Sequence, residues 1–123
     1  MSYVLEVKMD FAAAHIVRGH PGKCARLHGH NWEVRVRVKS SELNSIEITM
    51  DFADLKALIH EVIDPLDHQF LNEIPPFTEM NPTAERVSEF IYDSLAKKLP
   101  AHVRMDSVSL FETERCSVTF SRG

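Results

Sequence analysis

The chain has 123 residues, 44% of them hydrophobic, and we expect residues 1–123 to form a single domain with a real core. Its 14 lysine and arginine residues against 18 aspartate and glutamate residues give a net charge of -4, and no basic block stands out, which argues against a protein that binds the nucleic-acid backbone. No apolar run approaches the length of a membrane span, the N-terminus lacks a signal-peptide pattern, and the two cysteines do not indicate an oxidising compartment. We therefore expect a cytoplasmic protein with free thiols.

Two β-strands are predicted near the N-terminus, from an alternation of apolar and polar side chains. Odd-numbered positions are apolar across residues 5–11, and even-numbered positions are apolar across residues 32–39. If the first strand continues without a bulge, His15 lies on its apolar face. If the second strand begins earlier than residue 32, His30 and His28 lie on its apolar face. We therefore predict an antiparallel hairpin that brings these three imidazoles, the histidine trio, to one face near its closed end.

The spacing of the histidine trio predicts a metal centre. Next-but-one Cα atoms on a strand lie about 6.6 Å apart, and two imidazoles can bridge that gap to one ion at about 2.0–2.1 Å from each nitrogen. Three neutral nitrogen ligands suit Zn²⁺, and three protein ligands leave one position for water or substrate. The alternative is three unrelated polar histidines, but their matching parity, with Cys24 close by, favours the metal site.

Helical periodicity replaces the strand pattern in the middle of the chain. Apolar residues at helical spacing predict a helix over residues 52–63, with Asp51 as its N-cap. Before it, residues 46–50 either extend or end the second strand. A second helix is predicted to begin near Asn81 and Pro82, which form a cap-then-proline signal.

The C-terminal residues predict a second hairpin. A strand through Val108 and Leu110 meets a polar turn at residues 113–115 and a return strand over residues 116–120, in which Cys116 is expected to be a small core residue. The order β-β-α-α-β-β predicts an α+β fold, with two helices on one face of a four-stranded antiparallel sheet. The opposite face would be charged and either solvated, part of a tunnel or part of a subunit contact.

Asp67, His68 and Glu112 are further candidates for chemistry. Asp67 and His68 are adjacent just after the first predicted helix, and such a carboxylate can orient an imidazole and raise its basicity, although a capping turn is the simpler alternative. Glu112 shares the parity of the apolar face of its strand. A carboxylate on a half-buried face needs a partner, which is either a ligand or a salt bridge in the turn.

Six blocks of sequence occur in order along nearly the whole chain: FAAAH at 11–15, CARLHGH at 24–30, MDFADLK at 50–56, LDHQFLN at 66–72, NPTAE at 81–85 and ET at 112–113. Together they resemble the 6-pyruvoyl-tetrahydropterin synthase family. The resemblance is strongest to its bacterial branch, the 6-carboxy-tetrahydropterin synthases. Three residues separate Cys24 from His28, as in that branch, whereas the animal type has a longer insertion there.

The resemblance implies a site and an assembly. In that family pattern the histidine trio holds Zn²⁺, Cys24 abstracts a proton, Asp67 and His68 form the relay beside it, and Glu112 anchors the pterin ring, with a charge-relay role sometimes assigned to it. The family's tunnelling fold implies that three chains join their sheets into a barrel and that two rings stack, which gives a homohexamer as a dimer of trimers. The sites then lie between subunits.

The resemblance also implies an activity. The expected reaction is the zinc-dependent conversion of 7,8-dihydroneopterin triphosphate to 6-carboxy-5,6,7,8-tetrahydropterin, with loss of triphosphate and acetaldehyde, for queuosine biosynthesis. By charge alone, Lys23 and Arg26 are candidates to meet the triphosphate. Two alternatives stay open: a sister enzyme that makes 6-pyruvoyl-tetrahydropterin or cleaves the side chain as an aldolase, and a non-catalytic zinc-binding scaffold.

Overall fold

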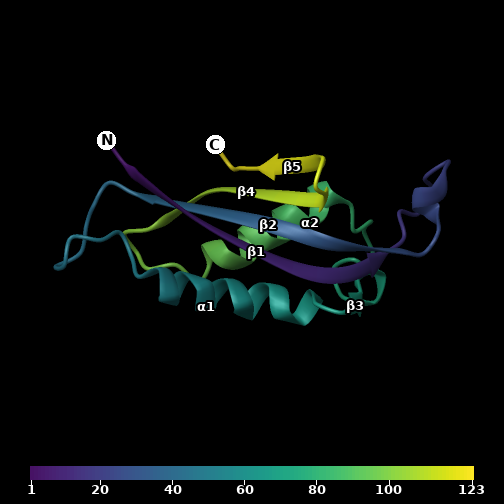
Figure 1. The fold of residues 1–123 in the computed structure, drawn as a ribbon, viewed down its shortest axis with the longest axis horizontal. Coiled ribbons are helices and arrows are strands. Elements are labelled where there is room, and N and C mark those ends of the chain that lie inside the picture. Colours follow the sequence, from purple (N-terminus) through teal and green to yellow (C-terminus); the bar gives the residue numbers. More distant parts are fainter.

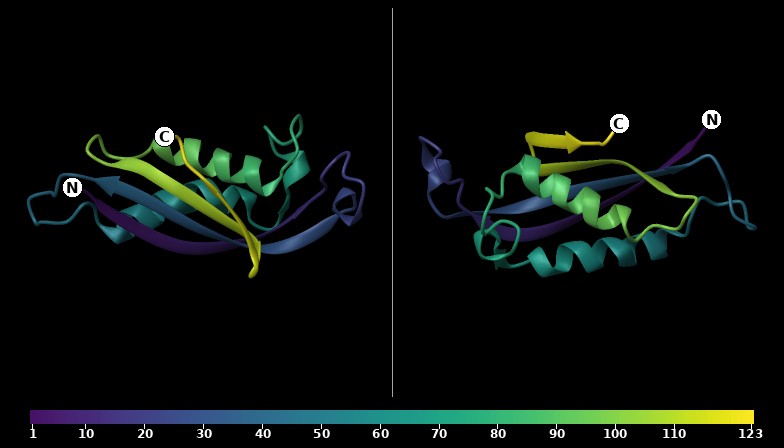
Figure 2. Two further views of the ribbon diagram at one scale, coloured as in Figure 1. Left: turned by 90° about the horizontal axis from the view of Figure 1, so that it is seen from above. Right: turned by 180° about the vertical axis from the view of Figure 1, so that it is seen from behind.

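A computed structural model describes residues 1–123 and shows two helices packed on one face of a five-stranded sheet (Figures 1 and 2). The sheet order is β3-β1-β2-β4-β5. The strands are β1 (Tyr3–His15), β2 (His28–Ser40), β3 (Gln69–Phe70), β4 (Arg104–Thr113) and β5 (Cys116–Phe120), and the helices are α1 (Phe52–Ile63) and α2 (Ala84–Ala96). Neither helix is long and apolar enough to cross a membrane.

The first hairpin forms as predicted. β1 and β2 pair antiparallel without interruption from Tyr3 opposite Ser40 to His15 opposite His28. Because side chains alternate between the two faces of a strand, the even-numbered residues of β2 from Trp32 onward are buried beneath the helices. The intervening charged residues lie on the other face, where they stay partly exposed; they are Glu33, Arg35, Arg37 and Lys39.

The helices begin at capping side chains. The carboxylate of Asp51 accepts the N–H of Ala53 at 2.7 Å, which confirms it as the N-cap of α1. The predicted start of α2 was too early, because Thr83 is the N-cap and its hydroxyl accepts the N–H of Arg86 at 3.1 Å. Asn81 instead directs its side chain to the backbone of residue 18.

The sheet has five strands rather than the four predicted, and one pair of strands is parallel. β3 contributes only two residues, which pair with Ala13 and Ala14 of β1. Two residues cannot display an alternating pattern, so this strand has no signature in the sequence. Residues 46–50 form no strand, and the N–H of Asn44 closes a turn there by donating to the carbonyl of Ile48 at 2.8 Å.

The prediction that Cys116 is a core residue is wrong. Cys116 is an exposed free thiol. It shares parity with Val118 and Phe120, which are partly buried and pack against the core, but it opens the strand at the hairpin turn, opposite Thr113. β5 is also an edge strand, so strand parity alone did not place its first residue in the core.

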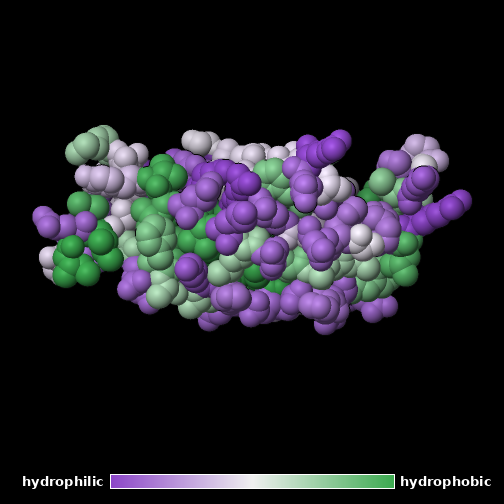
Figure 3. Space-filling model, viewed as in Figure 1, coloured by the Kyte–Doolittle hydropathy of each residue, from purple (hydrophilic) through white to green (hydrophobic).

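The surface shows where apolar side chains remain exposed. In Figure 3 the strand face is largely hydrophilic, and hydrophobic side chains gather at the end that holds the N-terminus and the loop after β2. The exposed large apolar residues of that end are Met1, Tyr3, Val4, Leu43, Ile46 and Phe52. This end lies opposite the loop that joins β1 to β2, as Figure 1 shows.

Candidate active site and metal centre

The histidine trio converges at the closed end of the first hairpin. One ring nitrogen from each of His15, His28 and His30 lies within 4.8 Å of the other two. The ring centroids are 4.4 Å apart for His15 and His28, 5.3 Å for His15 and His30, and 4.9 Å for His28 and His30. Register explains the convergence, because His15 pairs with His28 while Ala13 pairs with His30, which places all three imidazoles on one face.

Backbone carbonyl groups orient two of the rings. The Nδ1 atom of His15 lies 2.7 Å from the carbonyl oxygen of Pro82, and the Nδ1 atom of His28 lies 2.6 Å from that of Arg26. A carbonyl oxygen only accepts, so Nδ1 carries the hydrogen in both rings, and in the neutral form of each ring Nε2 has a free lone pair. Metal-binding histidines in proteins are usually held by such a hydrogen bond from the other nitrogen.

Two of the ring nitrogens in the trio have no hydrogen-bond partner. Nε2 of His15 and Nε2 of His30 are buried and form no hydrogen bond. A buried polar atom left without a partner costs about 1–3 kcal/mol. Burial also lowers the pKa of both imidazoles, which favours the neutral form that binds a metal. The three imidazoles therefore lie close enough together to bind a metal ion.

Glu112 lies beside the trio at the end of β4. Its Oε2 atom is 3.6 Å from Nε2 of His30, and both side chains are largely shielded from solvent. The parity argument placed Glu112 on the inner face, and the structure agrees. The partner that the structure gives this carboxylate is His30, and it forms no salt bridge within the turn.

Asp67 and His68 form the predicted pair at a strained turn. Oδ1 of Asp67 lies 3.0 Å from Nδ1 of His68 and accepts the N–H of Ala12 at 2.8 Å. That N–H, together with His68, holds the pKa of Asp67 below its ordinary value. His68 has a φ of 58°, in the left-handed region, and its own N–H donates to the carbonyl of Ala12.

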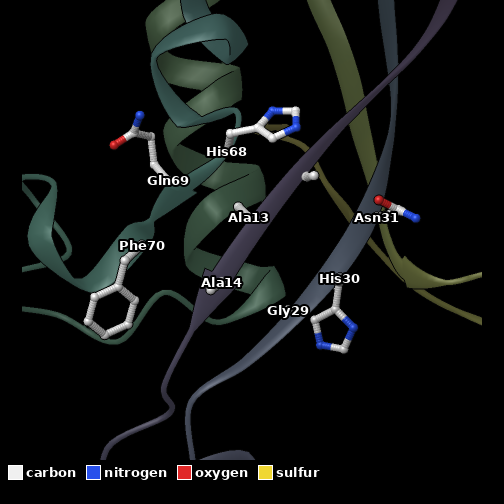
Figure 4. A pocket seen from close by; sticks show the side chains of 9 residues that line it. Ala13, Ala14, Gly29, His30, Asn31, His68, Gln69 and Phe70 are labelled. Carbon is white, nitrogen blue, oxygen red and sulfur yellow. The ribbon is translucent and has the colours of Figure 1, made fainter.

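The His68 imidazole is not directed at the trio of its own chain. Its side chain is 80% exposed, and Figure 4 shows His68 and His30 on opposite sides of β1. A shallow cavity of about 560 Å³ has both residues in its lining. Its floor between them is made of small residues, including Ala12, Ala14 and Gly29. Within one chain, β1 therefore lies between the Asp67–His68 pair and the candidate metal site.

Cys24 lies in the loop between β1 and β2, in a short 3₁₀ turn over Lys23–Ala25. Its thiol is free and half-buried. The carbonyl of Cys24 accepts the N–H of Val17 at 2.8 Å, which closes the base of the loop. The cluster of convergent ligand atoms consists of the three imidazoles and does not include the Cys24 sulfur.

Four groups that shape the site were not predicted from the sequence. The carbonyl oxygens of Arg26 and Pro82 orient imidazoles, and the side chains of Asn72 and Asn81 bind the backbone that follows β1. Carbonyl groups are common to all residues, so they leave no signal. The two asparagines fall within sequence blocks that resemble a known family, and this was the only signal available for them.

Comparison with known proteins identifies the family. The family model described as 6-pyruvoyl tetrahydropterin synthase matches residues 4–123. The chain belongs to the 6-pyruvoyl tetrahydropterin synthase family. This membership confirms the resemblance seen in the sequence and indicates a tetrahydropterin synthase enzyme.

Members of this family from distant organisms resemble the chain. The putative 6-carboxy-5,6,7,8-tetrahydropterin synthase of Archaeoglobus fulgidus is 37% identical over 95 residues, which are 77% of each chain. The 6-pyruvoyl tetrahydrobiopterin synthase of Homo sapiens is 37% identical over 103 residues, with 80% of this chain and 70% of that one covered. The structure of the Caenorhabditis elegans 6-pyruvoyl tetrahydropterin synthase superimposes with a TM-score of 0.86 at 24% identity, over 100% of this chain and 97% of that one. The fold is therefore that of the family.

Proposed function

We propose that the protein is a zinc-dependent lyase that converts 7,8-dihydroneopterin triphosphate and one water molecule into 6-carboxy-5,6,7,8-tetrahydropterin, triphosphate and acetaldehyde, for queuosine biosynthesis. The observation that carries the proposal is the histidine trio, in which two buried Nε2 atoms form no hydrogen bond. Family membership supports the pterin substrate class. The three-residue spacing between Cys24 and His28 favours the carboxy-forming branch.

His15, His28 and His30 would hold the zinc ion, which when bound supplies Lewis acidity to the hydroxyl groups of the substrate side chain. Glu112 would fix the other end of the substrate. An ionised carboxylate accepts hydrogen bonds only, and the amino-pyrimidine edge of a pterin offers N–H donors. Because Glu112 is 3.6 Å from His30, a pterin held by this carboxylate would have its side chain next to the trio.

Proton transfer would involve Cys24 and His68. As a thiolate, Cys24 would remove a proton from the substrate side chain. Asp67 holds Nδ1 of His68 at 3.0 Å, which leaves Nε2 of that ring to donate or accept the second proton. Because His68 lies across β1 from the trio of its own chain, this role requires a site shared between subunits.

We further propose that the protein assembles as a homohexamer, a dimer of trimers. The open edges of the sheet support this. β3 covers β1 only at Ala13 and Ala14, so most of the outer edge of β1 is unpaired, and β5 forms the other edge. Unpaired strand edges are ready to pair with another chain. Joined edge to edge, three sheets would close into a barrel whose inner face carries the charged side chains of β2. The two free thiols agree with a cytoplasmic location.

A second candidate is the sister reaction that yields 6-pyruvoyl-tetrahydropterin, or an aldolase-like cleavage of the same side chain. It is favoured by the 37% identity to the human protein named for the pyruvoyl product. A non-catalytic zinc-binding scaffold is the third. Incubation of the zinc-loaded protein with 7,8-dihydroneopterin triphosphate, followed by mass spectrometry, separates them. Carboxy-tetrahydropterin supports the proposal, a pyruvoyl or shortened pterin selects the second candidate, and unchanged substrate leaves the scaffold.

A further inference from the structure

Two asparagine side chains bind the backbone where β1 ends. The carboxamide oxygen of Asn72 accepts the N–H of Ile16 at 2.8 Å, and its nitrogen donates to the carbonyl of Ile16 at 3.0 Å. Asn81 does the same for Arg18, with both distances 2.9 Å. Each carboxamide therefore satisfies both backbone groups of one residue, as a neighbouring strand would. We call residues 16–18, which connect His15 to the loop of Cys24, the neck.

The two carboxamides extend the pairing of the outer edge of β1 beyond its last residue. Successive residues of an extended chain direct their backbone groups to opposite edges. Ala12 bonds to Asp67 and His68, and Ala14 pairs with β3, so even-numbered residues face this outer edge. Ile16 and Arg18 continue that series. The intervening Val17 uses its backbone groups elsewhere, and its carbonyl accepts the N–H of His20 at 3.2 Å in the turn that follows.

The opposite edge of the neck faces the loop that carries the thiol. There the N–H of Val17 donates to the carbonyl of Cys24 at 2.8 Å. This bond is the direct link between the neck and the turn that carries the thiol. The neck is therefore bound by the two carboxamides on one side and by the backbone of Cys24 on the other.

Asn81 is also coupled to the metal ligand His15. The next residue along, Pro82, accepts the Nδ1 hydrogen of His15 at 2.7 Å. The guanidinium of Arg18 returns to the same segment and donates to the carbonyls of Phe77 at 2.8 Å and Met80 at 3.3 Å. One short segment before α2 thus holds both the imidazole of His15 and the neck that follows it.

We propose that Asn72 and Asn81 are positioning residues that fix the neck and thereby set the position of Cys24 relative to His15. The consequence for turnover rests on the proposed function, in which Cys24 is the base. The consequence for the neck and for metal binding does not. Neither carboxamide has a partner other than the backbone it holds, so both act through other residues.

The test compares Asn72→Ala and Asn81→Ala with a matched control, Asn44→Ala, in the full chain. The carboxamide oxygen of Asn44 accepts the N–H groups of Ile46 at 3.0 Å and Ile48 at 3.3 Å, in the loop at the far end of the molecule (Figure 1). Amide hydrogen exchange of Val17, followed by NMR, reports directly on the neck. We expect faster exchange in both test variants and the wild-type rate in the control.

Two further measurements separate positioning from general stability. Titration of the metal-free protein with Zn²⁺ should show about 10-fold or more weaker binding in Asn81→Ala, through Pro82 and His15. Assayed at a temperature at which they are folded, Asn72→Ala and Asn81→Ala should have a kcat about 10²-fold lower than the wild type. KM should change little, as expected for a displaced catalytic group. Asn72→Asp and Asn81→Asp keep the accepting oxygen, so their Val17 exchange rate, Zn²⁺ affinity and kcat should lie between those of the wild type and the alanine variants. If the alanine variants do not fold, the aspartate variants replace them in the same test.

Each outcome has a defined meaning. Wild-type exchange at Val17 in both test variants would overturn the proposal, as would a lowered melting temperature with unchanged kcat. If the wild-type protein does not convert the substrate, the proposed function fails. In that case the Val17 exchange rate and the Zn²⁺ affinity still decide whether the asparagines hold the neck.

Discussion

The Nδ1 atom of His15 lies 2.7 Å from the carbonyl oxygen of Pro82, so a residue just before α2 orients an imidazole at the end of β1. This hydrogen bond joins positions 67 residues apart in sequence. It sets which nitrogen of His15 is available for a metal ion, and no side-chain substitution at position 82 removes the carbonyl itself. The candidate metal site is therefore oriented by the packing of the whole fold as well as by the hairpin that supplies its three imidazoles.

Replacing His28 should abolish stable metal binding. His28→Ala leaves two imidazoles, and a zinc site that keeps an open position needs three protein ligands. We expect zinc measured by elemental analysis after dialysis to fall from about one ion per chain to near zero. His60→Ala is the control, because His60 is exposed on α1 and pairs only with Asp64. Unchanged zinc in His28→Ala would refute the ligand set.

Replacing Cys24 should remove turnover without removing the metal. The Cys24 sulfur is outside the cluster of ligand atoms, so Cys24→Ala should keep its zinc. Loss of a general base typically costs about 10²–10⁴-fold in rate, and we expect a fall in kcat of this size. Cys116→Ala removes the exposed thiol at the other hairpin and should keep full activity. Full activity in Cys24→Ala would exclude the cysteine as the base.

Stability should depend on the ionisation of Asp67. The N–H of Ala12 holds the pKa of this carboxyl below its ordinary value in the folded protein. A depressed folded pKa stabilises the fold above the unfolded pKa, and this contribution is lost as the pH falls through the folded pKa. Asp67→Asn keeps an accepting oxygen but cannot ionise. Its deficit in free energy of unfolding should therefore be largest near neutral pH and shrink below about pH 4.

Urea denaturation at pH 7 and at pH 3 measures this effect. Asp10→Asn is the control, since Asp10 is exposed on β1 and provides the same chemical change without the Ala12 contact. A deficit of Asp67→Asn that stays constant between the two pH values would show that the Ala12 contact does not depend on the carboxylate charge.

Assembly should depend on the open edge of β1. Even-numbered residues of β1 direct their backbone groups outward, as Ala12 does, so the N–H of Lys8 is not used within the chain. Lys8→Pro removes a hydrogen-bond donor from the edge and should reduce the mass measured by analytical ultracentrifugation from that of a hexamer to that of a smaller species. Ser2→Pro, just before β1, should leave the mass unchanged. A monomeric wild-type protein would contradict the proposed assembly.

The hairpin and the histidine trio were predictable because strand parity depends only on local sequence. His15, His28 and His30 could be placed on one face before any tertiary contact was known. The features that were missed depend on distant partners. β3 exists through its pairing with Ala13 and Ala14, and the oxygen of Asn81 binds a backbone 63 residues away. The start of α2 was predicted too early for the same reason. The side chain of Asn81 binds the backbone of Arg18, and Thr83 is the N-cap of the helix.

The three imidazoles come from two strands joined by one loop, whereas the groups around them come from residues much later in the chain. Closing that loop costs about 1–2 kcal/mol less in conformational entropy than bringing in Pro82 or Glu112. The ligand cluster can therefore form early in folding, once β1 and β2 have paired. A metal ion bound at that stage would link the two strands before α2 docks, and would so contribute to folding.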